Sequence, residues 1–277
     1  MTGLRRKSCI RWASPAALLG ALVLASAGAP AAERGADGKF EKRVSSHFAL
    51  YQDVDIDQSG GLRGSRRFEQ QLLDELERAY QQLDHFLGLR PRRRIDVVVY
   101  DPAVFDASFG GLFRFQAAGF YHGVIRVRGD TRLTVQLGRV LHHELVHAAF
   151  DAAAPSLVLP AWVNEGVAEW FEARTLSKRR LSSGELGYLV QARQRGALLP
   201  LSTLSAPTFA GLPGHSAGLA YLQSYGMIEY LARRHGDRAL REFCEAVVRS
   251  RDIERSLRRT YRMGVLDLEA GFLADLG

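Results

Sequence analysis

The stretch that decides the fold is Leu141-His142-His143-Glu144-Leu145-Val146-His147. Because His143 and His147 are four residues apart, they lie on one face of a helix, one turn apart. Two neutral imidazoles held in this way can each give a nitrogen to one Zn²⁺, and Glu144 then lies near the open side of the metal. Apolar residues flank the motif on both sides. They predict a buried helix, in which two histidines and a glutamate need a reason other than packing.

A second stretch supplies the remaining candidate ligands: Pro160-Ala161-Trp162-Val163-Asn164-Glu165-Gly166-Val167-Ala168-Glu169-Trp170-Phe171-Glu172, for which we expect another helix. A catalytic zinc has three protein ligands and an open fourth position. Glu165, eighteen residues after His147, is well placed to be the third ligand. Glu169, one turn later on the same helix, is the alternative third ligand, and Glu165 would then lie behind it.

Taken together, His143, Glu144, His147, Asn164 and Glu165 resemble the sequence pattern of the gluzincin zinc peptidases, the superfamily of thermolysin and the membrane-alanyl-type aminopeptidases. The resemblance implies that His143, His147 and Glu165 bind zinc and that Glu144 is the catalytic base. It also implies a carboxylate four residues after the third ligand that hydrogen-bonds the first histidine, and Glu169 stands at that position. Such outer partners fix the tautomer of a metal-binding imidazole. Asn164, beside the third ligand, belongs to the same pattern.

Further site residues are expected on a helix predicted for residues 216–234. Its segment Tyr221-Leu222-Gln223-Ser224-Tyr225 resembles a recurrent segment of peptidase-MA-like bacterial proteins. Peptide hydrolysis passes through an oxyanion that needs a donor in addition to zinc, and Tyr221 is the candidate. Tyr225, one turn away, and His215 are expected to contact substrate. The alternative for Tyr221 is that it is an ordinary core residue of an apolar helix.

Residues 1–31 have the pattern of a secretory signal peptide. Cations at positions 5, 6, 7 and 11 precede an apolar run at 16–27, and small residues follow, so cleavage is expected after Ala31 or Ala32. The apolar run is short for a membrane span, although an uncleaved anchor is the alternative. We therefore expect a periplasmic or secreted mature chain with no stable membrane span.

Removing the signal peptide changes the charge of the chain. The formal net charge of +7 includes the four cations of residues 1–31, so the mature chain is near +3. Its basic clusters are short, scattered and without interleaved aromatic residues, which argues against a nucleic-acid partner. Cys244 is the one cysteine left after processing, so an internal disulfide is excluded. The fold must rest on its hydrophobic core.

The remaining pattern predicts an α+β fold. Strands are expected at 46–51, 94–100 and 119–128, and helices at 66–87, 103–109, from about 130 through the metal motif, and at 184–196, 216–234, 238–249 and 266–276. We interpret residues 32–277 as one zinc-peptidase-like domain. It would have a small mixed sheet with helices at about 40–155 and an all-helical lobe at about 156–277. The active site should lie between the two.

These observations predict an exported zinc metallopeptidase that cuts a peptide or protein substrate, with Glu144 as the proton acceptor. In gluzincins a strand before the metal helix forms the sheet edge and pairs with the substrate backbone, and the aminopeptidase branch carries a glutamate motif there. Residues 115–125 contain neither Asp nor Glu, which favours internal cleavage over amino-terminal trimming. The alternative is a non-catalytic protein of the same fold that acts as an envelope binding or assembly module, in which Glu144 would have no task.

Overall fold

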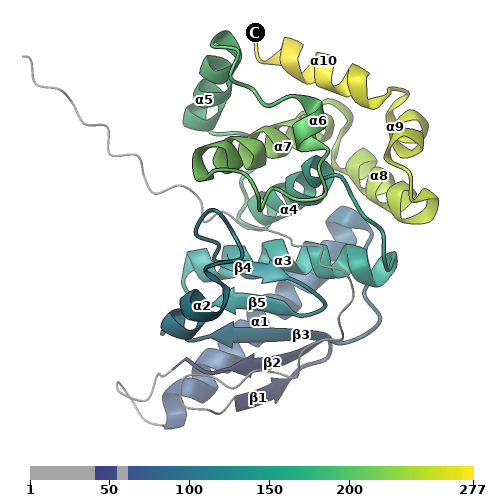
Figure 1. Cartoon of the computed structure of the whole chain (residues 1–277). Coiled ribbons are helices and arrows are strands. Elements are labelled where there is room, and N and C mark those ends of the chain that lie inside the picture. The colour runs from purple at the N-terminus through teal and green to yellow at the C-terminus, as the bar shows by residue number, and fades with distance from the viewer. Residues whose placement is uncertain (1–40, 55–61) are drawn as a thin grey trace, which may run out of the picture.

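The computed structural model describes residues 41–54 and 62–277 and has an α+β fold. A small sheet lies at one end of the molecule, and the other end is helical (Figure 1). In chain order the elements are β1 (Glu41–Val44), β2 (Phe48–Gln52), α1 (Leu62–Leu87), β3 (Ile95–Tyr100), α2 (Pro102–Phe109), β4 (Gly119–Tyr121), β5 (Ile125–Arg128), α3 (Val135–Ala153), α4 (Ala161–Thr175), α5 (Ser183–Gln194), α6 (Leu201–Leu204), α7 (Gly214–His235), α8 (Asp237–Ser250), α9 (Ile253–Tyr261) and α10 (Val265–Asp275). The signal peptide predicted for residues 1–31 lies outside the described residues. Within 41–54 and 62–277, no helix has the length and apolar character needed to cross a membrane.

The sheet is mixed, as the sequence predicts, and its strand order is β1-β2-β3-β5-β4. β3 is parallel to both neighbours, β2 and β5, whereas the edge strands β1 and β4 are antiparallel to theirs. The prediction of a single strand at 119–128 is wrong, because this segment forms the hairpin of β4 and β5. Gly123 permits the reversal with a φ of 68°, a left-handed conformation that favours glycine. β4 thus becomes the edge of the sheet.

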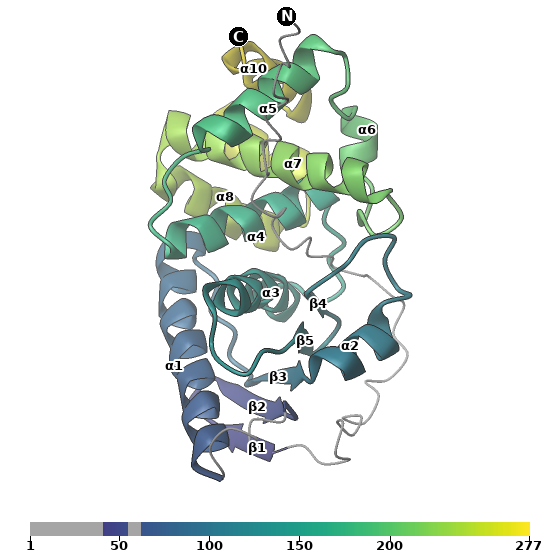
Figure 2. The ribbon, with the colours of Figure 1, turned by 90° about the vertical axis from the view of Figure 1, so that its left-hand side faces the viewer.

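Both faces of the sheet are covered. Successive side chains of a strand point to opposite faces, so Val97 and Val99 of β3 join the main core with α1 and α3. Val98 and Tyr100 join a smaller aromatic cluster on the other face, formed with α2 and the loop at residues 110–118. Figure 2 shows α1 and α3 on one side of the sheet and α2 on the other. A sheet packed on both sides is a firm support for α3.

The helices α4 and α7 approach each other closely at Gly166. A Cβ added to Gly166 would lie 2.6 Å from the carbonyl oxygen of Ser224 on α7, so only glycine fits without a shift of backbone. Glu165 immediately precedes this glycine, and Tyr221 lies one turn before Ser224. The close approach therefore brings the two helices that carry these predicted site residues together.

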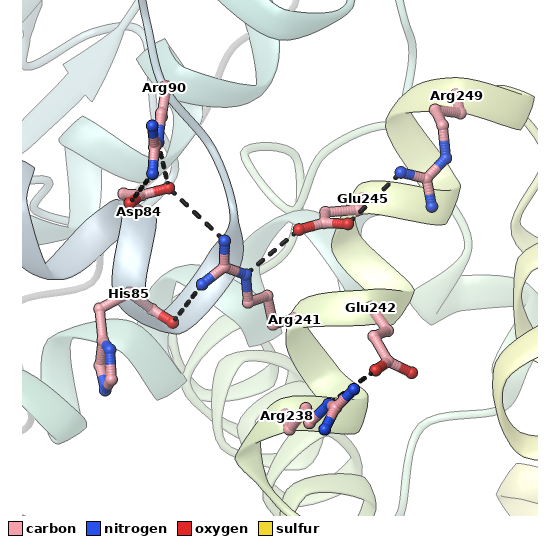
Figure 3. A network of polar contacts seen from close by, with 8 residues as sticks. All are labelled: Asp84, His85, Arg90, Arg238, Arg241, Glu242, Glu245 and Arg249. Carbon is pink, nitrogen blue, oxygen red and sulfur yellow. Dashed lines mark hydrogen bonds and ion pairs between the residues drawn. The ribbon is translucent and has the colours of Figure 1, made fainter.

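Arg241 of α8 joins the helical end of the molecule to the end of α1 (Figure 3). Its guanidinium lies 3.7 Å from Asp84 Oδ1, donates to the carbonyl oxygen of His85 at 3.4 Å, and donates to Glu245 at 3.2 Å. The chain leaves α1 through Gly88, whose φ is +67° and whose Cβ position would collide with the Glu245 side chain. Exposed ion pairs contribute about 0–1 kcal/mol each, so this network orients α8 on α1 more than it stabilises the fold.

Candidate metal centre

The motif His143, Glu144 and His147 lies in the middle of α3. Thr134 caps this helix by accepting a hydrogen bond from the Leu137 N–H at 3.2 Å, so α3 begins at Val135, not near residue 130 as expected. The helix passes between the sheet and α4 (Figure 1). All three motif side chains are buried: His143 and Glu144 are 0 % exposed and His147 is 4 % exposed.

Glu165 of α4 lies against both imidazoles. Its Oε2 is 3.2 Å from His143 Nε2 and 3.5 Å from His147 Nε2. The ligand atoms of the three residues lie within 4.8 Å of one another, and all three side chains are buried. Burial alone would raise the pKa of Glu165, but the two imidazoles outweigh it and lower the pKa to about 2. The carboxylate is therefore ionised and faces the Nε2 atoms of both histidines.

These distances fit a zinc ion. A tetrahedral zinc with bonds of about 2.0–2.1 Å holds its ligand atoms about 3.3 Å apart, close to the two separations between Glu165 and the histidines. Within the described residues, His147 Nε2 is buried without a hydrogen-bond partner. A buried polar atom without a partner costs free energy, and a bound cation would relieve that cost. Two histidines and one carboxylate are also a common protein ligand set for catalytic zinc.

Asn164 touches His147 from behind. Its Oδ1 lies 3.0 Å from His147 Nδ1, which is within hydrogen-bond distance. Because an amide oxygen only accepts, Nδ1 must carry the proton, and the lone pair is then on Nε2, toward Glu165. Asn164 thus selects the tautomer in which His147 can bind a metal through Nε2.

Two carboxylates, not one, face the outer nitrogen of His143. Glu169 Oε1 lies 3.8 Å and Glu172 Oε2 lies 3.7 Å from His143 Nδ1. Burial and the neighbouring Glu172 raise the pKa of Glu169. Among the described residues, Glu169 groups with His143 and Glu172 on this outer side, whereas Glu165 groups with both histidines. The geometry therefore favours Glu165 over Glu169 as the third ligand.

Glu172 and its partner Arg139 are site residues that we did not predict from the sequence. The Arg139 Nε donates to Glu172 Oε1. Glu172 lies seven residues after Glu165, a spacing that returns to the same face of a helix after about two turns. That spacing was a signal for Glu172. Arg139 stands four residues before His143, so it also lies on the metal face of its helix.

Glu144 has no hydrogen-bond partner among the described residues for either carboxylate oxygen, although both are buried. Burial and the nearby carboxylates raise the pKa of Glu144 to about 7, against the lowering effect of the two histidines. It is not part of the ligand cluster formed by Glu165 and the two imidazoles. Its position and pKa suit a group that exchanges a proton near neutral pH.

The three residues predicted on α7 have different surroundings. Tyr221 is 3 % exposed, its ring centroid lies 6.5 Å from that of His143, and its hydroxyl has no partner within the described part of the chain. Tyr225 is also buried, but its ring faces the ammonium of Lys178, 5.0 Å away. His215 is exposed in the first turn of α7. The structure thus brings Tyr221 to the cluster but does not bring Tyr225 or His215 there.

His142, the extra histidine of the motif, points away from the cluster. Its Nδ1 lies 2.7 Å from the Thr175 hydroxyl of α4, and its Nε2 lies 2.8 Å from Glu75 Oε1 of α1. These contacts pin α3 to two neighbouring helices. His142 therefore supports the helix that carries the candidate ligands and is not among them.

Comparison with protein-family models and with curated proteins yields no match. Among solved structures, the chain is similar to a two-domain M1 zinc metallopeptidase, crystallised as a glutamate-to-alanine mutant with bound L-tryptophan, with 14 % sequence identity and a TM-score of 0.44. The match covers 86 % of this chain and 52 % of that one, so this chain spans about half the length of that protein. A likeness this distant carries no argument about function, which must rest on the site itself.

Proposed function

We propose that this chain is a zinc metallopeptidase that hydrolyses peptide bonds within protein substrates. The observation that carries the proposal is the spacing of Glu165 Oε2 from His143 Nε2 and His147 Nε2, 3.2 and 3.5 Å, beside a buried carboxylate that has no partner within the described residues. A zinc ion held by these three residues supplies a Lewis acid that activates water and polarises a carbonyl.

The other residues of the site then have assigned tasks. Glu144 would accept the proton of the attacking water and donate it to the leaving amine, a role suited to a carboxylate whose pKa is raised by burial. The Tyr221 hydroxyl, buried and free of other partners among the described residues, donates to the substrate oxyanion. Asn164 keeps His147 in the tautomer that binds metal.

The position of the edge strand β4 favours the proposal of a polypeptide substrate. Within residues 41–54 and 62–277, β4 pairs with β5 on one side only, and it packs on α3. The Tyr121 hydroxyl of β4 donates to Asp151 Oδ2 at 2.7 Å, one helical turn after His147, and so ties the edge strand to the metal helix. An extended peptide added to this edge would run beside the cluster. Because residues 115–125 lack an acidic side chain for a free amino terminus, we propose internal cleavage.

The proposed location is the periplasm or the extracellular space, on the basis of the predicted signal peptide at residues 1–31. Amino-terminal sequencing of protein purified from its native host is expected to give a mature terminus near Ala32. An intact Met1 terminus on soluble cytosolic protein would refute export.

The second candidate function is a non-catalytic binding or assembly module of the same fold. The near-complete burial of the cluster, with His143, Glu144 and Glu165 each 0 % exposed, is the observation that favours it. A closed site would serve a metal that only stabilises the fold. We place it second because a structural site gives no role to Glu144.

One experiment separates these two functions. We expect the purified chain to contain one zinc and to hydrolyse an unfolded protein substrate. Glu144→Gln keeps the shape of the side chain but removes the proton acceptor, so it should retain zinc and lose at least about 10²-fold in turnover. Equal hydrolysis by both proteins would mean that Glu144 is not the base, and a zinc-loaded wild type without hydrolysis would favour the binding module.

A further inference from the structure

The outer side of His143 contains one guanidinium and two carboxylates, and these two carboxylates are held differently. Arg139 Nε donates to Glu172 Oε1, and the other oxygen of Glu172 faces His143 Nδ1 at 3.7 Å. Glu169 faces the same nitrogen at 3.8 Å, but it has no hydrogen bond among the described residues that would fix its carboxylate. Its side chain is 15 % exposed, compared with 3 % for Glu172.

Charge gives a reason for the guanidinium. Four glutamates, Glu144, Glu165, Glu169 and Glu172, lie in or beside the α3–α4 contact, and Arg139 is the cation that binds one of them there. A buried carboxylate without a charged partner is costly, often by several kcal/mol. Without Arg139, Glu172 would lose the bond that fixes it and would tend to rotate toward water.

We propose that Arg139 is a positioning residue for the metal centre: by holding Glu172, it makes Glu172, and not Glu169, the acceptor of the His143 Nδ1–H. This inference rests on the proposed zinc site. The hydrogen bond requires the 3.7 Å gap to close by less than about 1 Å, which a small side-chain rotation provides. An imidazole held in this way keeps its Nε2 lone pair directed at the metal, as Asn164 does for His147.

The chain contains a matched control for Arg139. Arg43 of β1 forms an ion pair with Glu69 of α1 at 3.0 Å, and the side-chain exposures of this pair, 30 % and 4 %, nearly equal those of Arg139 and Glu172, 29 % and 3 %. β1 and β4 are opposite edges of the sheet, and α3 packs on β4. Arg43→Gln therefore removes a similar ion pair away from the metal helix.

The test measures zinc affinity by competition with a chelator of known affinity and, separately, the melting temperature of the metal-free proteins. Both Arg139→Gln and Arg43→Gln should lower the melting temperature, but only Arg139→Gln should weaken zinc binding, by about 10–100-fold. Glu172→Gln should weaken zinc binding by a similar factor. The double variant Arg139→Gln/Glu172→Gln should bind zinc about as weakly as either single variant, because the two residues act as one unit. Arg139→Lys, which keeps the charge, should recover part of the lost affinity.

Unchanged zinc affinity in Arg139→Gln would overturn the inference, as would a larger loss in Glu169→Gln than in Glu172→Gln. Should Arg139→Gln fail to fold, Glu172→Gln and Arg139→Lys provide the same comparison. A wild-type chain that binds no zinc would instead refute the proposed function itself. The absorption spectrum of the Co²⁺-loaded proteins offers a second readout, since a misoriented His143 should change it in Arg139→Gln but not in Arg43→Gln.

Discussion

Glu144 and Glu165 are both fully buried carboxylates in the α3–α4 contact, yet their surroundings give them opposite proton affinities. Burial raises the pKa of Glu144 to about 7, whereas the two imidazoles lower that of Glu165 to about 2 in spite of its burial. A metal ligand must be ionised, and a base works best when its pKa is near the working pH. Titratable groups whose pKa values are driven apart in one site commonly have separate roles, and the roles proposed here are base for Glu144 and ligand for Glu165.

The ligand role proposed for Glu165 can be tested by comparison with Glu169. Glu165→Ala should abolish tight zinc binding, because it removes the atom that contacts both histidine nitrogens. Glu169→Ala should leave zinc in place, since Glu169 faces the outer nitrogen of His143. Metal content after dialysis against a weak chelator measures both. If Glu169→Ala loses zinc and Glu165→Ala keeps it, the assignment of the third ligand is reversed.

The Tyr221 hydroxyl is buried without a partner among the described residues, so its removal tests the oxyanion role proposed for it. A buried hydroxyl without a partner costs on the order of 1 kcal/mol or more, so Tyr221→Phe should not destabilise the metal-free fold and is expected to stabilise it. Turnover should fall by about 10²-fold if the hydroxyl donates to the oxyanion. The measurements are urea unfolding and hydrolysis rate.

Tyr261 of α9 is the control for this prediction, because its hydroxyl is also buried without a partner among the described residues, in a different helix. Tyr261→Phe should affect stability in the same direction and leave turnover unchanged. Equal turnover in Tyr221→Phe and the wild type would mean that Tyr221 is an ordinary core residue without a catalytic role, the alternative that the sequence leaves open.

At the scale of elements, the helices and strands that could be predicted from the sequence are those with a clear local pattern of apolar residues. α3 and α4 follow from apolar spacing and from the motif residues, and β3 follows from its run of apolar residues closed by Asp101 and Pro102. β1 is not predicted from the sequence, because its segment, Glu41–Val44, is mostly charged, as edge strands often are. The β4–β5 hairpin is not predicted either, because its turn, His122-Gly123-Val124, continues the apolar pattern and lacks the two-residue sequence, such as Asn-Gly, that usually marks a hairpin turn. α9 is strongly polar, so its few apolar residues do not predict a helix.

The contact of α4 with α7 gives a prediction at the element scale. Gly166→Ala should destabilise the fold by about 1–3 kcal/mol, because the new methyl group would press on the Ser224 carbonyl and the Ile228 side chain. Gly187, within α5, is the control, since a Cβ there meets nothing within 4 Å. Gly187→Ala should instead stabilise the fold by about 0.5–1 kcal/mol, because alanine lowers the conformational entropy of the unfolded chain and favours the helix more than glycine does. Chemical denaturation of both variants tests the pair, and equal effects would mean that α7 does not approach α4 this closely.

At the scale of the whole molecule, the structure encloses the site that the sequence predicts to be in a cleft. A surface pocket lies elsewhere, lined by α1 and by Arg132 and Leu133 of the segment before α3. The 110–118 loop of the sheet end contacts both the segment before α7 and α7 itself: the Arg114 N–H donates to the Ala210 carbonyl at 3.3 Å, and the Phe115 ring lies 6.3 Å from that of Tyr221. Local sequence patterns cannot predict such closure, because it depends on contacts between segments about a hundred residues apart.

We expect the proposed protein substrate to reach Glu144 by separation of these two segments, and a disulfide across them tests this expectation. A Cβ built on Gly214 lies 3.8 Å from the Phe115 Cβ, the separation at which disulfides form most readily. The double variant Phe115→Cys/Gly214→Cys should therefore oxidise readily, and Cys244 is buried and does not compete. In the oxidised form, hydrolysis of an unfolded protein should stop, zinc should remain, and its removal by a chelator should slow. The reduced form of the same variant is the control, because it contains the same substitutions with the segments free to part. Hydrolysis at equal rates in both forms would show that substrate enters by another route.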